Sequence, residues 1–380
     1  MAHDTLEGNR HPGIPRQAAP DALPAAIEGT LADFLATQIG GLDTVDEALG
    51  GFARTARDLV LAGGKRLRPT FAYWGWRGVA AADEPVEPLL PALAALELMH
   101  TFALVHDDVM DESATRRGLP TAQRIFAARH VRRGGRGDAD RFGSAAAILV
   151  GDLLLMWADQ LLARSAMPTA TLFAVRSGYD RMRVEAVAGQ YLDVLGEADP
   201  AAWSVERALL VARLKTASYT VQRPLEFGLA LSGIVEPAAE SAYERYGIAV
   251  GEAFQLRDDL LGVYGDPAVT GKPAGDDLRS GKPTALLMLA HRLATSTQRA
   301  ELAIDPAGTV NPADGSGGLT PADVARRAQV IAETGAPARI EAMIAARVAD
   351  GVAAVAKAEI HEDARAALID LAVRATHRPA

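Results

Sequence analysis

The sequence of 380 residues contains no cysteine, which excludes disulfide bonds and thiolate metal ligands and fits a reducing compartment. Basic residues are in the minority, and the net charge of −9 argues against a nucleic acid partner, because phosphate backbones require a basic face. The N-terminus lacks the basic-then-apolar pattern of a signal peptide, and no run approaches eighteen uncharged apolar residues. We therefore predict a cytoplasmic protein that does not span a membrane.

Sustained alternation of apolar and polar residues, which strands require, is also absent, whereas helical spacing dominates from Leu23 onward. Apolar residues make up 49% of the chain, enough for a large core. We predict an all-α single domain over residues 23–380, preceded by a disordered arm over residues 1–22. Residues 132–138 and 305–318 are predicted as surface loops. The predicted helices cover 24–39, 43–62, 69–80, 88–111, 120–130, 143–163, 169–194, 203–231, 238–264, 283–293, 320–333, 337–356 and 361–374.

The most informative stretch runs from His100 to Asp111 at the end of an apolar helix. Asp107 and Asp111 are four residues apart and share one helix face, with Asp108 about 100° round the axis. Three carboxylates this close repel one another, so a countercharge is expected. Hard carboxylate oxygens suit Mg²⁺, which usually takes one or two of them together with water and phosphate oxygens.

A second acidic stretch contains Gln255, Asp258, Asp259 and, beyond Gly262, Asp266. Their spacing allows all of them to lie on one helix face. Metal sites in helical bundles are commonly built from side chains on opposed helices. We therefore predict that the two acidic stretches face each other.

Basic residues occur in loops near these acids, and such loops can grip phosphate groups. Taken alone, each of these basic residues could instead have a purely structural role. Cations at Lys65 and Arg68 also suit the end of a helix on dipole grounds, and a lone histidine such as His100 on an apolar helix is more often a core or capping residue. The other basic residues in such places are Arg116, Arg117, Lys215, Lys272 and Lys282.

Six motifs, in this order along the chain, resemble those of the short-chain trans-polyprenyl diphosphate synthase family, in particular its geranylgeranyl diphosphate synthases. They are GGKRLRP (63–69), ELMHTFALVHDDVMDESATRRG (97–118), GQYLD (189–193), KT (215–216), FQLRDDLLGVYGDPAVTGKP (254–273) and GKPT (281–284). The resemblance implies the isoprenoid synthase fold, a helical bundle around a deep central cavity. It also implies three Mg²⁺ ions, for which Mn²⁺ can substitute, and a homodimer.

The reaction implied is the head-to-tail condensation of isopentenyl diphosphate with an allylic diphosphate (dimethylallyl, geranyl or farnesyl). By resemblance, the metals are held by Asp107, Asp111 and Asp258, supported by Asp108 and Asp259. The allylic diphosphate is bound by Arg116, Lys215, Gln255 and Lys272, and isopentenyl diphosphate by Lys65, Arg68, His100 and Arg117. Gln190 and Asp193 line the cavity, Lys282 contributes to substrate binding, and Thr216 lies near the reacting carbons.

The sequence departs from the family pattern at two positions. Gly262 stands where the second motif usually ends in aspartate, which leaves the metal affinity of that motif open. Pro283 stands where the family more often has arginine, and it can start the next helix without losing a needed N–H.

Residues that precede the first motif on its helix predict the product length. Ala103, Phe102 and Met99 lie four, five and eight residues before Asp107, so they line the path of a growing tail. In the family that this sequence resembles, a single aromatic residue at the fifth position before the first motif is typical of enzymes whose product has twenty carbons. We expect geranylgeranyl diphosphate, with farnesyl diphosphate as the alternative.

Two other functions would use part of this pattern. A terpene cyclase shares the fold and one aspartate-rich helix, but it needs no second diphosphate site and normally has an Asn/Ser/Glu second metal motif. A non-catalytic subunit or scaffold would leave the matching acidic faces and basic loops without a reason.

Overall fold

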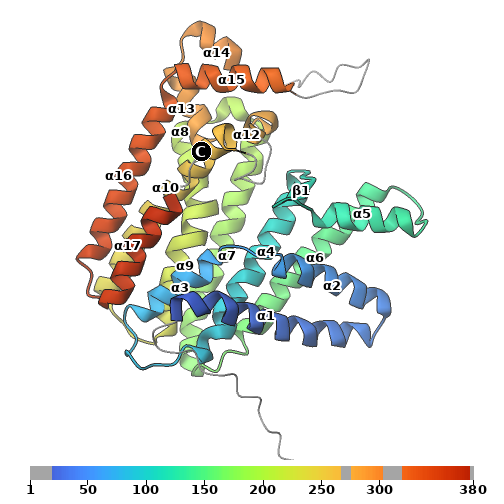
Figure 1. The fold of residues 1–380 in the computed structure, drawn as a ribbon, viewed down its shortest axis with the longest axis vertical. Coiled ribbons are helices and arrows are strands. Elements are labelled where there is room, and N and C mark those ends of the chain that lie inside the picture. Colours follow the sequence, from blue (N-terminus) through green and yellow to red (C-terminus); the bar gives the residue numbers. More distant parts are fainter. Residues whose placement is uncertain (1–18, 267–274, 303–318, 377–380) are drawn as a thin grey trace, which may run out of the picture.

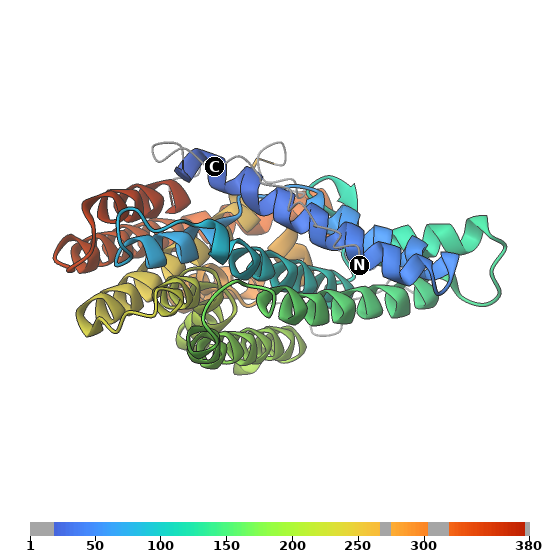
Figure 2. The same cartoon turned by 90° about the horizontal axis from the view of Figure 1, so that it is seen from below.

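The structure is a computed structural model that describes residues 19–266, 275–302 and 319–376. The long helices α4 (Leu90–Met110), α7 (Thr169–Ala198) and α10 (Pro237–Tyr264) lie near the middle of the view in Figure 1. Seen from below, α1 (Ala19–Asp43) lies along one side and α7 along the opposite side (Figure 2). The all-α prediction is therefore confirmed.

The N-terminal half packs around α4, which is apolar on nearly every side and is buried along most of its length. The predicted loop at residues 132–138 is confirmed as the link between α5 and α6. The first helix begins at Ala19, inside the last residues of the predicted arm. Besides α1 and α4, this half contains α2 (Glu47–Leu61), α3 (Leu67–Arg77), η1 (Glu87–Leu89), β1 (Thr115–Arg116), β2 (Leu119–Pro120), α5 (Ala122–Arg132) and α6 (Ala139–Leu162).

The two strands form a small antiparallel ribbon that the sequence analysis missed. Thr115 pairs with Pro120 and Arg116 with Leu119. Arg117 and Gly118 make the turn between them, both with positive φ. The ribbon closely follows the acidic end of α4, so it returns Arg116 toward Asp107 and Asp108.

The C-terminal half packs around α10. Three short helices were not predicted, namely η2, α12 and α14, and the predicted loop at 305–318 lies outside the described residues. Besides α7 and α10, the half contains η2 (Pro200–Ala202), α8 (Val205–Val211), η3 (Ala212–Gln222), α9 (Arg223–Leu231), α12 (Asp276–Ser280), α13 (Ala285–Leu293), α14 (Ser296–Leu302), α15 (Pro321–Glu333), α16 (Ala336–Ala356) and α17 (Glu362–Thr376).

The continuous helix predicted over 203–231 is wrong in its middle. The segment η3 winds as a π-helix of 11 residues between α8 and α9. Its backbone is approached closely by two glycines: a Cβ at Gly189 of α7 would lie 2.5 Å from the backbone nitrogen of Lys215, and one at Gly251 of α10 would lie 2.4 Å from Cα of Ala217. π-Helices are rare and frequently mark functional sites.

Two described helices, Glu87–Met110 and Ala139–Leu162, are long and apolar enough to cross a membrane. The first is largely buried, as expected for the core helix of a water-soluble protein, and it contains Glu97 in an ion pair with Arg66. The second is less buried, and its Asp159 pairs with Arg183. Length and composition alone are therefore weak evidence for a membrane span.

Candidate active site

The first acidic stretch is neutralised by cations from three other segments. One Asp107 oxygen accepts hydrogen bonds from Lys215 at 3.0 Å and Gln190 at 3.1 Å, and the other accepts one from Arg116 at 3.0 Å. Arg116 also donates to buried Asp108 at 2.8 Å. Burial opposes ionisation of Asp107, but the neighbouring Lys215 and Arg116 outweigh it and hold the pKa of this carboxyl well below its usual range. Asp107 is therefore a carboxylate at neutral pH.

Two lysines join α4 to α7. Lys215 lies 2.7 Å from Asp193 as well as 3.0 Å from Asp107. Lys282 lies 2.8 Å from Asp111 and 3.3 Å from Glu197. Burial lowers the pKa of Lys282, but the charges of Asp193 and Asp111 have the larger combined effect and raise this pKa above its ordinary value. The ammonium group therefore stays charged. The structure thus brings the predicted Gln190, Asp193, Lys215 and Lys282 together with the first acidic stretch.

Glu197 was missed by the sequence analysis. It lies four residues after Asp193 on α7, so helical spacing alone could have found it. Burial raises the pKa of its carboxyl, an effect that Lys282 opposes and Asp111 reinforces.

The second acidic stretch is linked by hydrogen bonds to Thr216, the residue next to Lys215. Thr216 donates to Gln255 at 2.5 Å, and Gln255 donates to Asp259 at 2.8 Å. The other oxygen of Asp259 accepts the backbone N–H of Ala285 at 3.1 Å. Asp259 is buried, and burial together with the nearby charges of Asp277 and Asp258 raises its pKa to about 7. Each of its two oxygens therefore already accepts one hydrogen bond from the protein.

The structure shows what occupies the space beside Gly262. A Cβ placed on Gly262 would lie 1.9 Å from a carboxylate oxygen of Asp277. Asp277 belongs to α12, a helix of only 5 residues that packs on α10. The space that a side chain at position 262 would need is therefore filled by another carboxylate.

A second basic group lies around Tyr219, on the same π-helix as Lys215. The Arg68 guanidinium lies 4.1 Å from the centroid of the Tyr219 ring and donates to Thr220 at 2.8 Å. The Tyr219 hydroxyl is 3.3 Å from Nδ1 of His100. Burial, followed by the charges of Arg68 and Arg117, lowers the pKa of His100 well below its ordinary value, so its imidazole is neutral at pH 7. Tyr219 and Thr220 were missed because their partners lie more than a hundred residues away.

A buried ion pair fixes the loop that precedes α3. Arg66 has a left-handed backbone with φ 47°, and its guanidinium lies 2.7 Å from Glu97 of α4. Arg117 donates to the carbonyl of Gly63, and a Cβ at Gly64 would lie 2.9 Å from the Arg117 guanidinium. Lys65, a predicted site residue, lies between Gly64 and Arg66 in this loop. Glu97 was not singled out by the sequence analysis, although it opens the quoted motif.

The residues predicted to set product length lie on α4 against the core. Met99 is buried, whereas Phe102 and Ala103 are half-buried. The Phe102 ring centroid is 4.9 Å from that of His106, and His106 lies 2.9 Å from the carbonyl oxygen of Ile148 on α6. Helix α6 therefore borders this part of α4.

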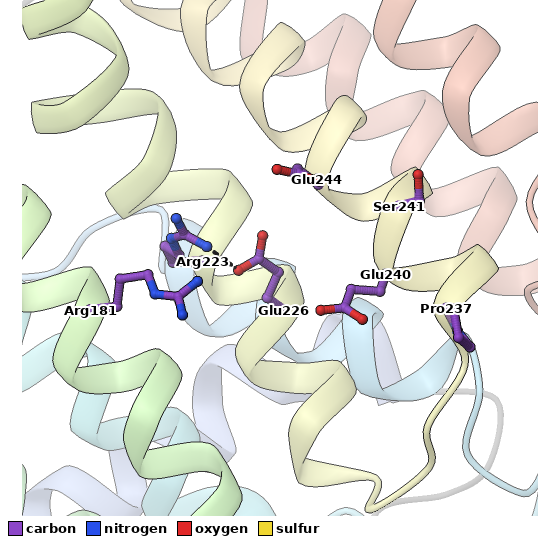
Figure 3. A pocket seen from close by; sticks show the side chains of 7 residues that line it. All are labelled: Arg181, Arg223, Glu226, Pro237, Glu240, Ser241 and Glu244. Carbon is purple, nitrogen blue, oxygen red and sulfur yellow. Dashed lines mark hydrogen bonds and ion pairs between the residues drawn. The ribbon is translucent and has the colours of Figure 1, made fainter.

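Lys272 lies outside the described residues. A pocket of about 300 Å³ opens elsewhere, between α7, α9 and α10 (Figure 3). Arg223 in this pocket pairs with Glu226 and Glu185, so the lining is an ion-pair network with little apolar surface. No predicted site residue lines it.

The donors at the acidic stretches fit Mg²⁺ that arrives with a phosphate ligand. Within residues 19–266, 275–302 and 319–376, no three His, Cys, Asp or Glu side chains are gathered so as to hold a metal ion by themselves. Mg²⁺ rarely needs such a cage, because one or two carboxylates with water and phosphate oxygens satisfy it. Asp107 and Asp111 on one helix and Asp258 on another supply oxygen donors of this kind.

Comparisons with known proteins agree with this geometry. The family model described as polyprenyl synthetase matches residues 51–305. A geranylgeranyl diphosphate synthase of Mycobacterium tuberculosis is 34% identical over 74% of this chain and 74% of its own. A geranylfarnesyl diphosphate synthase of Aeropyrum pernix is 32% identical over 73% of this chain and 78% of its own.

Among solved structures, the geranylgeranyl pyrophosphate synthase of Corynebacterium glutamicum, complexed with isoprenyl diphosphate and magnesium, superposes with a TM-score of 0.86. It is 38% identical, and the similarity covers 94% of this chain and 99% of that one.

Proposed function

The chain belongs to the polyprenyl synthetase family and is a short-chain trans-prenyl diphosphate synthase, and from this premise we propose that it makes mainly geranylgeranyl diphosphate. The substrates are isopentenyl diphosphate and an allylic diphosphate (dimethylallyl, geranyl or farnesyl), joined head to tail. Farnesyl diphosphate is the alternative product.

The observation that carries the proposal is that one π-helical segment, η3, takes part in two separate groups of basic residues. Lys215 of η3 faces the acidic end of α4, whereas Tyr219 of η3 contacts Arg68 and His100. A condensation of two diphosphates needs two anion sites side by side. A terpene cyclase needs only one, so the second group favours the synthase.

The allylic diphosphate is assigned to the group around Asp107, where Arg116, Lys215 and Gln255 offer hydrogen-bond donors, with Lys272 as a further predicted ligand. Asp107, Asp111 and Asp258 are the proposed metal ligands, supported by Asp108 and Asp259. The family is generally magnesium-dependent, and we assign three ions. When bound, Mg²⁺ would neutralise charge on the leaving diphosphate.

Isopentenyl diphosphate is assigned to Lys65, Arg68, His100 and Arg117. A neutral His100 still offers one N–H donor to an anion. The surrounding arginines supply the charge, and Arg geometry suits phosphate oxygens.

The chemistry follows from how these side chains hold the reactants. Arg116 and Lys215 stabilise the negative charge that develops as the allylic C–O bond breaks, which is preorganised electrostatic stabilisation. The isopentenyl double bond attacks the resulting allylic cation. Thr216, which donates a hydrogen bond to Gln255, is assigned to the position near the reacting carbons. The departing diphosphate accepts the proton that is lost, so no dedicated protein base is required.

Product length is assigned to α4. Ala103 leaves room for the tail one turn from Asp107, and Phe102 narrows the path beyond it. Emptying this position with Phe102→Ala is expected to lengthen the product, as judged by chain-length analysis.

The proposed homodimer is supported by an exposed apolar stripe. On α7, four exposed apolar or aromatic side chains recur every three or four residues, which places them on one face. Soluble proteins rarely leave such contiguous faces uncovered. The stripe consists of Val184, Val187, Tyr191 and Val194. Helix α6 also exposes large apolar side chains, namely Phe142, Ile148, Leu149 and Met156. With no membrane span proposed, we place this dimer in the cytoplasm.

The decisive experiment is incubation with labelled isopentenyl diphosphate and each allylic primer in turn, followed by chain-length analysis. A main product of twenty carbons is expected. Diphosphate should be released from the allylic substrate only when isopentenyl diphosphate is present. Release without it, together with a cyclic product, would identify a cyclase instead.

A further inference from the structure

We propose that Glu185 of α7 is a positioning residue for the second diphosphate site, because it holds the end of the π-helix η3 that carries Tyr219 and Thr220. The inference rests on the proposed function, since it assumes that the basic group around Tyr219 binds isopentenyl diphosphate. Glu185 lies outside the six motifs of the sequence, and its role is to act through η3 rather than on a substrate.

The first observation is the set of hydrogen bonds that converge on Glu185. One carboxylate oxygen accepts from Nη2 of Arg223 at 2.7 Å, and the other accepts from Nε of Arg223 at 2.9 Å and from the hydroxyl of Ser218. Burial raises the pKa of the Glu185 carboxyl, but the hydrogen bonds from Arg223 and Ser218 outweigh burial and lower this pKa below its ordinary value. Glu185 is therefore a carboxylate at neutral pH, bound to Ser218 within η3 and to Arg223 at its end.

Ser218 and Arg223 are also joined through the backbone. The N–H of Arg223 donates to the carbonyl of Ser218, five residues earlier, which is the hydrogen bond that defines π-helical winding. In an α-helix, side chains five residues apart would point about 140° away from each other. Here both side chains reach one carboxylate, so Glu185 bridges the two ends of a single π-helical hydrogen bond. This bridge favours the wide turn at the C-terminal end of η3.

This turn carries the residues that face the second basic group. Tyr219 and Thr220 follow Ser218 directly, and both are buried. The Tyr219 hydroxyl lies 3.3 Å from Nδ1 of His100. The Arg68 guanidinium lies 4.1 Å from the centroid of the Tyr219 ring and donates to Thr220 at 2.8 Å. A shift of this turn would therefore move the partners of Arg68 and His100, which are assigned to isopentenyl diphosphate.

The preceding turn of η3, which carries Lys215, is held by other contacts. A Cβ at Gly189 would lie 2.5 Å from the backbone nitrogen of Lys215, so α7 approaches the backbone closely at this point. Thr216 donates a hydrogen bond to Gln255 of α10. Loss of Glu185 should therefore disturb the site for isopentenyl diphosphate more than the site for the allylic diphosphate.

The ion pairs at the pocket in Figure 3 provide a matched control. Arg223 pairs with Glu226 as well as with Glu185, and 21% of the side chain of each glutamate is exposed. The hydroxyl proton of Ser218 is donated to Glu185. Glu226 therefore shares the same arginine at the same exposure but lacks the bond to Ser218.

Steady-state KM values for the two substrates provide the test. Glu185→Gln keeps the size of the side chain, removes its charge and leaves one acceptor oxygen in place of two. We expect KM for isopentenyl diphosphate to rise about 10-fold and KM for the allylic primer to change less than about 2-fold. Glu226→Gln, which removes the same charge beside the same arginine, should change both KM values by less than about 2-fold.

Ser218→Ala isolates the bond between Glu185 and η3. Its effect on KM for isopentenyl diphosphate should not add to that of Glu185→Gln in a double-mutant cycle, because both changes weaken the same bond. Far-UV circular dichroism and urea denaturation confirm first that each variant is folded. If Glu185→Gln does not fold, Ser218→Ala carries the test by itself and should raise KM for isopentenyl diphosphate alone.

Four results would overturn the inference: unchanged KM for isopentenyl diphosphate in Glu185→Gln, an equal rise for both substrates, an equal rise in Glu226→Gln, or additive effects in the cycle. Where Ser218→Ala carries the test, an unchanged KM would do the same. The proposed function fails separately, if the wild-type chain does not extend an allylic diphosphate. An active wild-type chain, with Glu185→Gln showing the same KM for isopentenyl diphosphate, rejects only the role of Glu185.

Discussion

The buried pair of Arg66 and Glu97 allows a quantitative prediction about stability. Both side chains are almost fully enclosed, with 5% and 3% of their surfaces exposed, and their charged atoms are 2.7 Å apart. Arg66 also donates to the carbonyl of Val60, whereas the second oxygen of Glu97 is buried without a hydrogen bond. Removing one partner therefore leaves the other as an uncompensated charge in the core.

The expected magnitude follows from this enclosure. Breaking a buried pair by removing one partner costs about 3–5 kcal/mol, whereas replacing both partners by apolar side chains is often neutral or stabilising. We therefore expect Arg66→Met and Glu97→Leu each to lower the free energy of unfolding by about 3–5 kcal/mol. The double variant should lie near the wild type, so the two losses should not add.

Equilibrium urea denaturation of the four proteins measures these values as a double-mutant cycle. The exposed pair of Arg326 and Glu301 is the matched control, and its disruption should cost less than about 1 kcal/mol. Strictly additive losses in the buried pair would refute the reasoning, because the double variant would then be the least stable of all. The activity of a stable double variant also shows whether the pair is needed to orient the loop.

Four further predictions concern the site. Asp107→Asn should reduce turnover by at least about a hundredfold, as should a chelator, and full activity in chelator would exclude the metal. Lys65→Ala should raise KM for isopentenyl diphosphate more than KM for the allylic primer, and Lys215→Ala the reverse; equal effects would mean that the two sites are wrongly assigned. Ala103→Phe should shorten the product, and an unchanged product length would place the cavity floor on another helix. The pKa of His100 in the folded state is lowered below its ordinary 6.5, so its contribution to the free energy of unfolding should be lost as the pH falls below about 6.5. His100→Gln should flatten the curve of unfolding free energy against pH in this range. An unchanged slope would contradict the prediction.

Local patterns predicted much of the helical framework. The helix over Pro321–Glu333 was predicted within one residue, because Thr320 and Asp323 form a capping box whose spacing is readable in the sequence. By contrast, α12 consists of 5 residues between two left-handed glycines, too short for any periodic pattern. The π-helix was missed for a different reason, since winding of that kind leaves no distinct signal in composition.

The sequence predicted only part of the arrangement of charges at the site. Repulsion among the aspartates was expected, and Asp107 was expected to need a countercharge. In the structure this countercharge comes from Arg116 and Lys215, which lie far from each other in the chain. The sequence had assigned both residues to the binding of the allylic diphosphate. Contacts such as Tyr219 with His100 depend on how helices pack, and spacing along one helix does not reveal them.

The π-helical winding of η3 has an evolutionary consequence. A wide turn of this kind accommodates one more residue than an α-helical turn without moving the helices on either side. Lys215 and Tyr219 lie four residues apart on this segment and contact different partners: Lys215 pairs with Asp107 and Asp193, and Tyr219 lies beside Arg68 and His100. A one-residue deletion between them would restore regular winding and turn one side chain by about 100° relative to the other, away from its partners. Such a deletion could make the helix more regular and more stable while it removed one of the two anion sites, so selection for function would preserve a segment that selection for stability alone would have shortened.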